Sequence, residues 1–220
     1  VHLEEDTARS QHVGEASLVD FNRAGVPLME LVTKPVIHSA EDAGAFAREL
    51  QLVLRYLGAS EANMEKGEMR VEANISVSPG ETLGTKVEVK NLNSFRSVER
   101  AIQFEIARHV EVLEAGGTLV QETRGWNEAT GATFSQRKKE GAHDYRYFPD
   151  PDLPKLKLSE VAEFSHDTLV ASLPELPWKK RERLAGLGFL QPQDIEQLVG
   201  DAELSLLFSQ METELKEPEL

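Results

Sequence analysis

The sequence has no cysteine among its 220 residues, and this absence limits the chemistry open to it. Disulfide bonds, thiolate metal sites and a cysteine nucleophile are all excluded, so any bound metal must use Asp, Glu or His as ligands. A cytosolic compartment is therefore permitted, and we expect a cytoplasmic protein. Apolar runs are also short, because none approaches the roughly 20 residues that a membrane-spanning helix needs.

Basic residues are scarce as well. The chain has 24 Lys and Arg against 38 Asp and Glu, which gives a formal net charge of −14. Non-specific binding to nucleic acid requires a Lys/Arg-rich face that neutralises phosphates, so this class of function is disfavoured. If RNA is a partner, most contacts to its backbone must lie elsewhere.

Several nucleotide-binding and catalytic signatures are missing. The sequence contains no G-x-x-x-x-G-K-[ST] phosphate loop, no G-x-G-x-x-G dinucleotide turn, no H-E-x-x-H zinc pair and no G-x-S-x-G nucleophile elbow. A nucleotide site in this chain would therefore be of the carboxylate-lined sheet type.

The length allows one sizeable core and a smaller second unit. We expect residues 1–155 to form the main domain, because a Pro- and Asp-rich passage at 149–154 breaks regular structure, and residues 156–220 to begin a helical domain. The sequence opens at Val1 without a Met or a signal peptide and stops without a terminating feature, so we expect a fragment.

Hydrophobic periodicity predicts strands and helices of an α+β protein. Residues 18–21 are typical of a short strand, and the apolar run 27–33, bounded by prolines, predicts a buried strand. Helical spacing of apolar residues predicts one helix over 39–57 and another between Asn93-Ser94 and Gly116-Gly117. The remaining predicted elements are an extended segment at 134–148 and helices at 158–172, 177–187 and 194–215.

An antiparallel hairpin with one dry and one polar face is predicted between the two long helices. Residues 69–77 alternate strictly between apolar and polar side chains, and residues 85–90 do the same after a Pro/Gly loop. Interleaved acidic and basic residues suit a site that holds a divalent cation and phosphate together, but ordinary strands also show such pairs to water. The polar face carries Arg70, Glu72, Asn74, Ser76, Lys86, Glu88 and Lys90.

Glu30 is the first candidate for a functional residue. It is flanked by apolar residues in the run 27–33, and an unpaired carboxylate is costly to desolvate. A cation must therefore face Glu30. The sequence leaves these interpretations open: an Arg or Lys partner, a partly wet strand edge, or a bound metal ion.

Two further groups could contribute to a site. The amino-terminal cluster of His2, Glu4, Glu5 and Asp6 offers imidazole and oxygen ligands, although short acidic runs are usually solvated. Residues 137–148 contain Arg137, Lys138, Lys139 and Arg146, of which an arginine could clamp a phosphate or carboxylate. The alternative for this second group is an aromatic-rich edge strand.

Six ordered motifs along the chain are distinctive. The longest is LVDFNRAGVPLMELVT at 18–33, and the others are HLEED at 2–6, RVEANIS at 70–76, KNLNSF at 90–95, QETR at 121–124 and DYRYFP at 144–149. Together these motifs resemble the B subunits of aspartyl/glutamyl-tRNA amidotransferases, continuously from residue 2 to about residue 187.

The resemblance implies an ATP- and Mg²⁺-dependent ligase that works within a heterotrimer. The B subunit would phosphorylate the side-chain carboxylate of Glu or Asp misacylated on tRNA, and an amidase (A) subunit would release ammonia from glutamine, with a small C subunit completing the assembly. Ammonia would then displace phosphate to give Gln-tRNA or Asn-tRNA. The implied catalytic domain is an antiparallel-sheet cradle similar to the glutamine synthetase/guanido kinase fold, followed by helical domains.

The resemblance also assigns roles to individual residues. Glu5 and Glu30 match metal ligands, and Glu72 falls where the family places a third acidic ligand, often Asp. From the hairpin face we predict that Arg70, Lys86 and Lys90 contact phosphate or carboxylate during catalysis. Nucleotide-binding residues are predicted to be Arg70, Asn74, Ser76 and Arg137.

Two family segments have no counterpart in this sequence. These are an amino-terminal stretch with a G-L-E-V-H motif and a carboxy-terminal tRNA-binding tail, so we expect the isolated polypeptide to be inactive in transamidation. One alternative function is a non-catalytic docking scaffold for the amidase and tRNA. Another is a free-standing amide ligase acting on a small acid.

Overall fold

The computed structural model describes residues 1–138 and 157–216, and it confirms the expected α+β class. The chain forms two compact units, Val1–His38 and Ser39–Leu220, which are called here the N-terminal unit and the main unit. The domain boundary predicted near residue 155 lies outside the described residues and stays a prediction. Across residues 1–138 and 157–216, no helix is both long and apolar enough to cross a bilayer.

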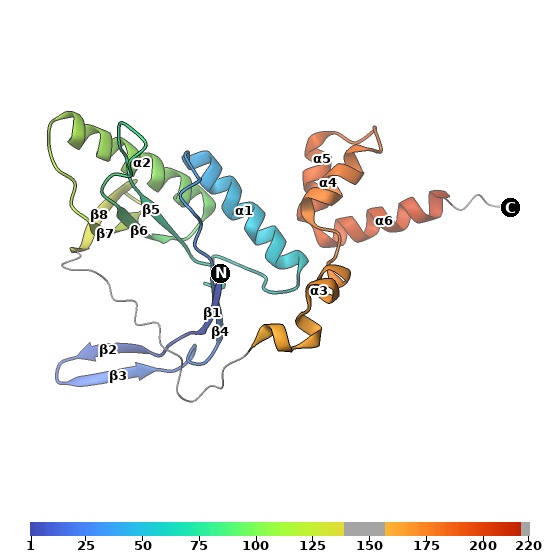
Figure 1. Cartoon of the computed structure of the whole chain (residues 1–220), viewed down its shortest axis with the longest axis horizontal. Helices are drawn as coiled ribbons and strands as arrows, with labels where there is room; N and C mark the ends of the chain where they lie inside the picture. The colour runs from blue at the N-terminus through green and yellow to red at the C-terminus, as the bar shows by residue number, and fades with distance from the viewer. Residues whose placement is uncertain (139–156, 217–220) are drawn as a thin grey trace. The chain divides into compact units, whose positions relative to one another are not determined.

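The N-terminal unit consists of two antiparallel two-stranded ladders (Figure 1). Strand β1 (His2–Glu5) pairs with β4 (Pro27–Glu30), and β2 (Arg9–Val13) pairs with β3 (Ala16–Asp20). The turn between β2 and β3 contains Gly14 at φ +61°, a conformation that glycine adopts without steric cost. Strand β3 confirms the short strand predicted at 18–21.

The buried strand predicted at 27–33 is wrong in two respects. Strand β4 ends at Glu30, and the residues after it are exposed, with Val32 at 70%. Among the described strands β4 pairs with β1 alone, so its apolar side chains are not enclosed between layers as they would be in a central strand.

Two long helices of the main unit follow the sequence prediction closely. Helix α1 (Ala40–Tyr56) begins after Ser39, whose side chain accepts a hydrogen bond from the Asp42 amide, and α2 (Phe95–Glu114) begins after Ser94 in the same way. Beyond the end of α2, Gly116 adopts φ +73°, as expected for a residue that terminates a helix. Both predicted helices are confirmed.

A four-stranded sheet with the order β5-β6-β7-β8 forms the centre of the main unit. Strands β5 (Val71–Ile75) and β6 (Val87–Leu92) are antiparallel, which confirms the predicted pairing. Strand β7 (Glu122–Asn127) was not predicted and runs parallel to β6, because α2 carries the chain back before β7 begins. Strand β8 (Ala132–Lys138) is antiparallel to β7, so the sheet is mixed and not purely antiparallel as expected.

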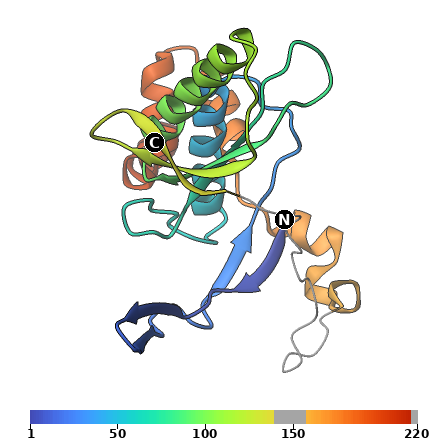
Figure 2. The same cartoon turned by 90° about the vertical axis from the view of Figure 1, so that its left-hand side faces the viewer.

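Helix α2 packs on one face of this sheet, and α1 packs beside α2 (Figure 2). Strand residues that alternate toward α2, such as Ile75 and Val89, are buried together with Val98 of α2 and Trp126 of β7. The alternate residues lie on the opposite face, which is called here the polar face. Its charged and hydrogen-bonding residues are Glu72, Asn74, Glu88, Lys90 and Thr123.

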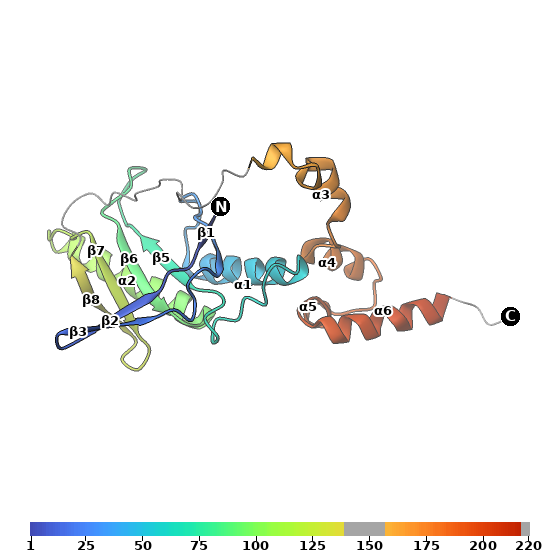
Figure 3. The same cartoon turned by 90° about the horizontal axis from the view of Figure 1, so that it is seen from below.

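The carboxy-terminal part of the main unit is helical, as predicted (Figure 3). Its core of Leu184, Ile195, Leu198 and Val199 packs against α1, and the Tyr56 hydroxyl donates to the Val199 carbonyl at 2.8 Å. The elements are two 3₁₀ turns (Leu158–Glu160 and Ala162–Phe164), α3 (His166–Ser172), α4 (Pro177–Ala185), α5 (Pro192–Gly200) and α6 (Ala202–Lys216).

Two of the helices predicted in this part were too long. Only α3 forms within 158–172, since the preceding residues make short 3₁₀ turns. The helix predicted at 194–215 divides at Asp201, which is extended and whose carboxylate accepts a hydrogen bond from the Leu204 amide at 2.9 Å. An aspartate in this position stops one helix and caps the next.

Candidate functional site

The β1–β4 ladder brings Glu30 next to the amino terminus of the chain. Its register places His2 opposite Glu30 and Glu5 opposite Pro27. Side chains of paired residues point to the same face of a ladder, and side chains alternate along each strand. His2, Glu4 and Glu30 therefore share one face.

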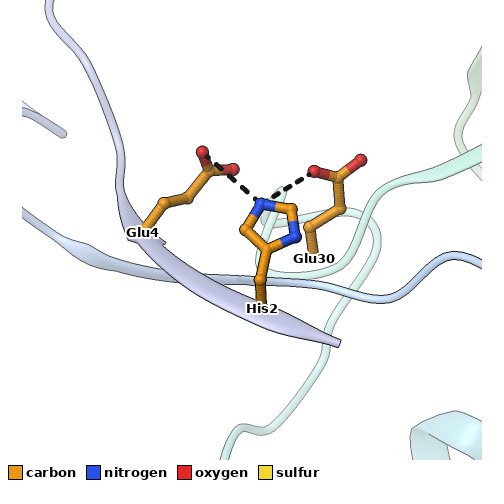
Figure 4. Close-up of side chains that lie close together, drawn as sticks. All are labelled: His2, Glu4 and Glu30. Carbon is orange, nitrogen blue, oxygen red and sulfur yellow. Dashed lines mark ion pairs between the residues drawn. The ribbon is translucent and has the colours of Figure 1, made fainter. Parts of the chain in front are cut away.

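These three side chains form a compact cluster (Figure 4). The Nε2 atom of His2 lies 3.2 Å from Oε2 of Glu30 and 3.8 Å from Oε2 of Glu4. One ligand atom from each residue lies within 4.8 Å of the others. The three side chains thus converge on a volume the size of a single ion.

Asp6 fixes the end of the ladder where the chain leaves β1 and returns to β4. Its backbone amide donates to the Val26 carbonyl at 2.8 Å, and its carbonyl accepts from the Gly25 amide at 2.9 Å. Its carboxylate accepts a 2.7 Å hydrogen bond from Nε of Arg23. The turn motif between β3 and β4 therefore holds β4 in register with β1, which sets the position of Glu30.

The donor set of this cluster suits a divalent cation. Two carboxylates supply the oxygen ligands that Mg²⁺ prefers, and an imidazole nitrogen is also accepted by transition ions such as Mn²⁺. The side chains are accessible, with exposed fractions of 37% for His2, 44% for Glu4 and 49% for Glu30. A histidine between two exposed carboxylates would by itself contribute little stability, so the convergence is better suited to binding than to holding the ladder together.

The three predicted metal ligands do not all lie in this cluster. Glu5 is at the other end of the ladder from Glu30 and points to the opposite face. Glu72 belongs to the main unit, where Nζ of Lys90 lies 2.9 Å from its carboxylate. Metal binding by Glu5 and Glu72 stays a prediction. The sequence indicated His2 and Glu4 only as members of a general acidic cluster, because pairing of β1 with β4 cannot be read locally.

Lys90 is the centre of the polar face of the sheet. Its Nζ atom contacts Glu72 on β5 and, at 3.5 Å, Glu88 on its own strand. Thr123 on β7 donates a 2.8 Å hydrogen bond to the Glu88 carboxylate. Burial alone would lower the pKa of Lys90, but the hydrogen bond and charge of Glu72, with those of Glu88, outweigh it and raise that pKa. Lys90 is therefore firmly cationic.

The other predicted nucleotide or phosphate residues surround this face. Asn74 is exposed on β5, Ser76 follows β5, and Arg70 and Lys86 precede β5 and β6. The backbone of Arg137 belongs to β8, whereas its side chain and the motif at 144–149 lie outside the described residues. Roles for these residues in binding stay predictions.

A buried ionic cluster lies on the face of the sheet that α2 covers, and it was not predicted from the sequence. Glu105 of α2 is fully buried and lies 3.2 Å from Nε of Arg124 on β7, while Nη2 of Arg108 donates to it at 2.7 Å. Thr133 of β8 also donates to Glu105. His109 Nε2 approaches Glu105 at 3.2 Å without the alignment of a hydrogen bond. This cluster fixes α2 on the sheet.

Electrostatics explain why Glu105 remains ionised in the core. Burial by itself would raise its pKa, but the neighbouring His109, Arg108 and Thr133 outweigh burial and lower the pKa from 4.5 to about 2. Because its carboxylate is already surrounded by donors, Glu105 is suited to a structural role. The signal in the sequence is only the pair Glu105 and Arg108, which charged helix faces commonly contain.

Comparison with known proteins defines the class to which this fold and site belong. Residues 1–163 match the model of the GatB/GatE catalytic domain. This match covers most of the chain, and the protein belongs to the GatB/GatE family. The resemblance inferred from the six motifs is thereby confirmed.

Curated relatives are named as B subunits of aspartyl/glutamyl-tRNA(Asn/Gln) amidotransferase. The one from Herpetosiphon aurantiacus is 50% identical over 212 residues, which are 94% of this chain and 43% of that protein. Those from Persephonella marina and Coxiella burnetii are each 49% identical, covering 94% and 98% of this chain but 44% and 45% of their own lengths. The chain thus spans less than half the length of these curated relatives.

Proposed function

We propose that this chain provides part of the activating site of a tRNA-dependent amidotransferase. In that reaction ATP phosphorylates the side-chain carboxylate of Glu or Asp carried on a misacylated tRNA, and ammonia then forms the amide. The observation that carries this proposal is the convergence of His2, Glu4 and Glu30 within 4.8 Å, in a chain of the GatB/GatE family.

The chemistry explains why such a site is needed. A carboxylate is a poor acyl donor until one of its oxygens becomes part of a good leaving group. In the first step, a carboxylate oxygen bonds to the γ-phosphorus of ATP and the bond to ADP breaks. In the second, the ammonia nitrogen bonds to the acyl carbon, phosphate leaves, and a proton is lost. Phosphoryl transfer of this kind depends mainly on positioning and on neutralising charge.

The residues present fit a role in charge neutralisation. Glu4 and Glu30 would hold Mg²⁺, with His2 as a third ligand, and the ion would screen the phosphate oxygens during transfer. Within the main unit, and as a separate prediction, Arg70 and Lys86, which precede β5 and β6, would contact phosphate or the acceptor carboxylate. On the polar face of the sheet, Lys90 is a cation held between Glu72 and Glu88. Asn74 on β5 and Ser76 just after β5 would contribute to nucleotide binding.

Partners follow from the same proposal. Ammonia would come from an amidase (A) subunit, a small C subunit would complete a heterotrimer, and the acylated RNA would be Glu-tRNA, Asp-tRNA or both. The net charge of −14 agrees with a chain that handles the acylated end of the tRNA and leaves most of the phosphate backbone to other surfaces. Activity in the cytoplasm belongs to this proposal as well.

The decisive experiment replaces Glu30 by Gln in an assembled amidotransferase that contains this sequence. Transfer of the γ-phosphate should collapse, whereas glutamine hydrolysis by the amidase should continue. Unchanged phosphate transfer would show that Glu30 does not hold the metal.

A docking scaffold is a second candidate function, favoured by one observation. The β2–β3 hairpin and the turn after it expose large apolar residues, with exposed fractions of 59% for Val13, 58% for Leu18 and 69% for Phe21. Calorimetry distinguishes the candidates. An absence of Mg²⁺-ATP binding in an assembly that still forms would favour the scaffold.

A further inference from the structure

A hollow of about 590 Å³ lies beyond the carboxyl ends of the parallel strands β6 and β7. It is formed by the junction of β6 with α2, by the turn between β7 and β8, and by Phe134 of β8. Its volume is within the usual range for small-molecule sites. In sheets with parallel strands, ligands commonly bind at this position.

Strand β6 has a β-bulge where it borders the hollow. Val71 pairs with Leu92 and Ala73 pairs with Val89, so that Glu72 faces two residues of β6, of which the second is Asn91. Asn91 has a φ of +65°, a left-handed conformation that asparagine tolerates better than most residues. Bulges of this kind re-aim side chains and are frequent beside functional sites.

Two carboxamides on this side of the hollow belong to Asn91 and Asn93. Within the described ranges, no hydrogen bond reaches the side chain of Asn91 or of Asn93. The carboxamide of Asn127, on the opposite side, accepts hydrogen bonds from the backbone amides of Ala129 and Thr130 and so shapes the turn. Asn91 and Asn93 are therefore available to a ligand.

The charged groups at the hollow are already neutralised. Among the described residues that line it, Glu128 is charged and none is Lys or Arg. The Glu128 carboxylate accepts hydrogen bonds from Ser97 at 2.8 Å, from the Trp126 indole at 2.6 Å and from Arg100 at 2.6 Å. The hollow thus presents neutral donors and acceptors, which suit a base or sugar better than a phosphate.

An aromatic surface completes the site. Phe134 is 46% exposed, and its ring extends over Gly125, where an added Cβ would lie 2.6 Å from Cζ of the ring. An exposed ring supported by a glycine offers a surface on which a planar base can stack.

We propose that this hollow binds an adenosine, with its base against Phe134 and its edge read by the carboxamides of Asn91 and Asn93. A carboxamide can donate to and accept from the N6 and N7 atoms of adenine at once. The Glu128 carboxylate already accepts three hydrogen bonds, so its oxygens are largely engaged and are less suited to accept from guanine or cytosine. This inference rests on the proposed function, in which adenosine occurs both in ATP and at the 3′ end of tRNA.

Intrinsic fluorescence provides a direct test. The chain has two tryptophans, of which Trp126 lines the hollow, so a Trp178→Phe background leaves one reporter at the site. Adenosine, added without metal to the whole chain, should change Trp126 fluorescence, whereas uridine at the same concentration should not. Asn91→Gly removes a carboxamide while tolerating the positive φ, and it should weaken adenosine binding roughly tenfold.

Control variants separate recognition from folding. Phe134→Leu should also weaken adenosine binding, because it keeps apolar bulk but removes the stacking surface. Gln210→Ala removes an exposed carboxamide on α6 and should bind adenosine as the parent does. The proposal is overturned if adenosine has no effect on Trp126, if uridine acts equally, or if Asn91→Gly and Phe134→Leu bind adenosine unchanged while their circular dichroism and melting temperature match the parent.

Competition distinguishes the two sources of the adenosine. If ATP displaces adenosine and an RNA hairpin ending in CCA does not, the hollow is part of the nucleotide site. If only the hairpin displaces adenosine, the hollow receives the tRNA end. Displacement by neither overturns the proposal. Failure of the proposed function would be seen separately, as unchanged phosphate transfer in Glu30→Gln.

Discussion

Two glutamates of this chain occupy opposite environments. Glu105 has no exposed surface and is surrounded by Arg108, Arg124 and Thr133, which hold its charge in place. Glu30 is 49% exposed, and its described ionic neighbour is His2 at 3.2 Å. The first carboxylate joins a helix to a sheet, and the second lies on an open ladder beside another carboxylate.

This difference shows which carboxylates can serve chemistry. A buried ion that has been fully paired cannot bind a new cation without leaving its former partners uncompensated. An exposed carboxylate that shares a face with other ligands loses little when it exchanges water for a metal ion. The proposed site therefore consists of exposed residues whose ion pairs contribute little to stability.

The largest expected effect comes from neutralising the buried carboxylate. Glu105→Gln leaves Arg108 and Arg124 without their shared anion, so the free energy of unfolding should fall by about 3–5 kcal/mol. Urea denaturation of the whole chain measures this value. Glu30→Gln is the matched control and should change it by less than about 0.5 kcal/mol. Equal losses in the two variants would remove the distinction between them.

Acid should destabilise the packing of α2 on the sheet by protonating Glu105. The pKa of Glu105 is lowered from 4.5 to about 2, so its stabilising effect is complete above pH 4.5 and is lost as the pH falls through about 2. Lowering a pKa by one corresponds to about 1.4 kcal/mol, so the ionised Glu105 carboxylate contributes about 3 kcal/mol to the free energy of unfolding. The difference in unfolding free energy between the parent and Glu105→Gln should therefore shrink between pH 5 and pH 2. A constant difference would contradict the assignment.

A smaller effect is expected on the polar face of the sheet. The pair of Lys90 with Glu72 is partly exposed, with side-chain fractions of 38% and 45%. Glu72→Gln should lower the free energy of unfolding by less than about 1 kcal/mol, and added salt should reduce the effect further. A loss as large as that of Glu105→Gln would place Glu72 among the structural carboxylates.

Local signals in the sequence were sufficient for the two long helices and the β5–β6 pair. Ser39 and Ser94 cap helices through contacts only three residues away, and strict alternation identified both strands. These features depend on neighbours in the sequence, which is why they could be predicted.

Long-range contacts account for what was missed. Strand β7 was not predicted because Glu122 and Arg124 point toward α2, where an apolar residue would normally be expected. They are accommodated by their own pairing at 2.6 Å, by hydrogen bonds with Ser135 and Thr133 on β8, and by the charge of Glu105 on α2, so most of their partners lie on other elements. The place of His2 in the candidate site likewise depends on the pairing of β1 with β4.

The central claim is that the His2, Glu4 and Glu30 cluster binds a divalent cation, and Mn²⁺ provides the most direct test because its binding is followed by electron paramagnetic resonance. The parent chain should bind Mn²⁺, Mg²⁺ should compete for the site, and Glu30→Gln should weaken binding at least tenfold. Glu15→Gln, an equal charge change in the exposed β2–β3 turn, should leave binding intact. Equal Mn²⁺ affinity in the parent and Glu30→Gln would contradict the account.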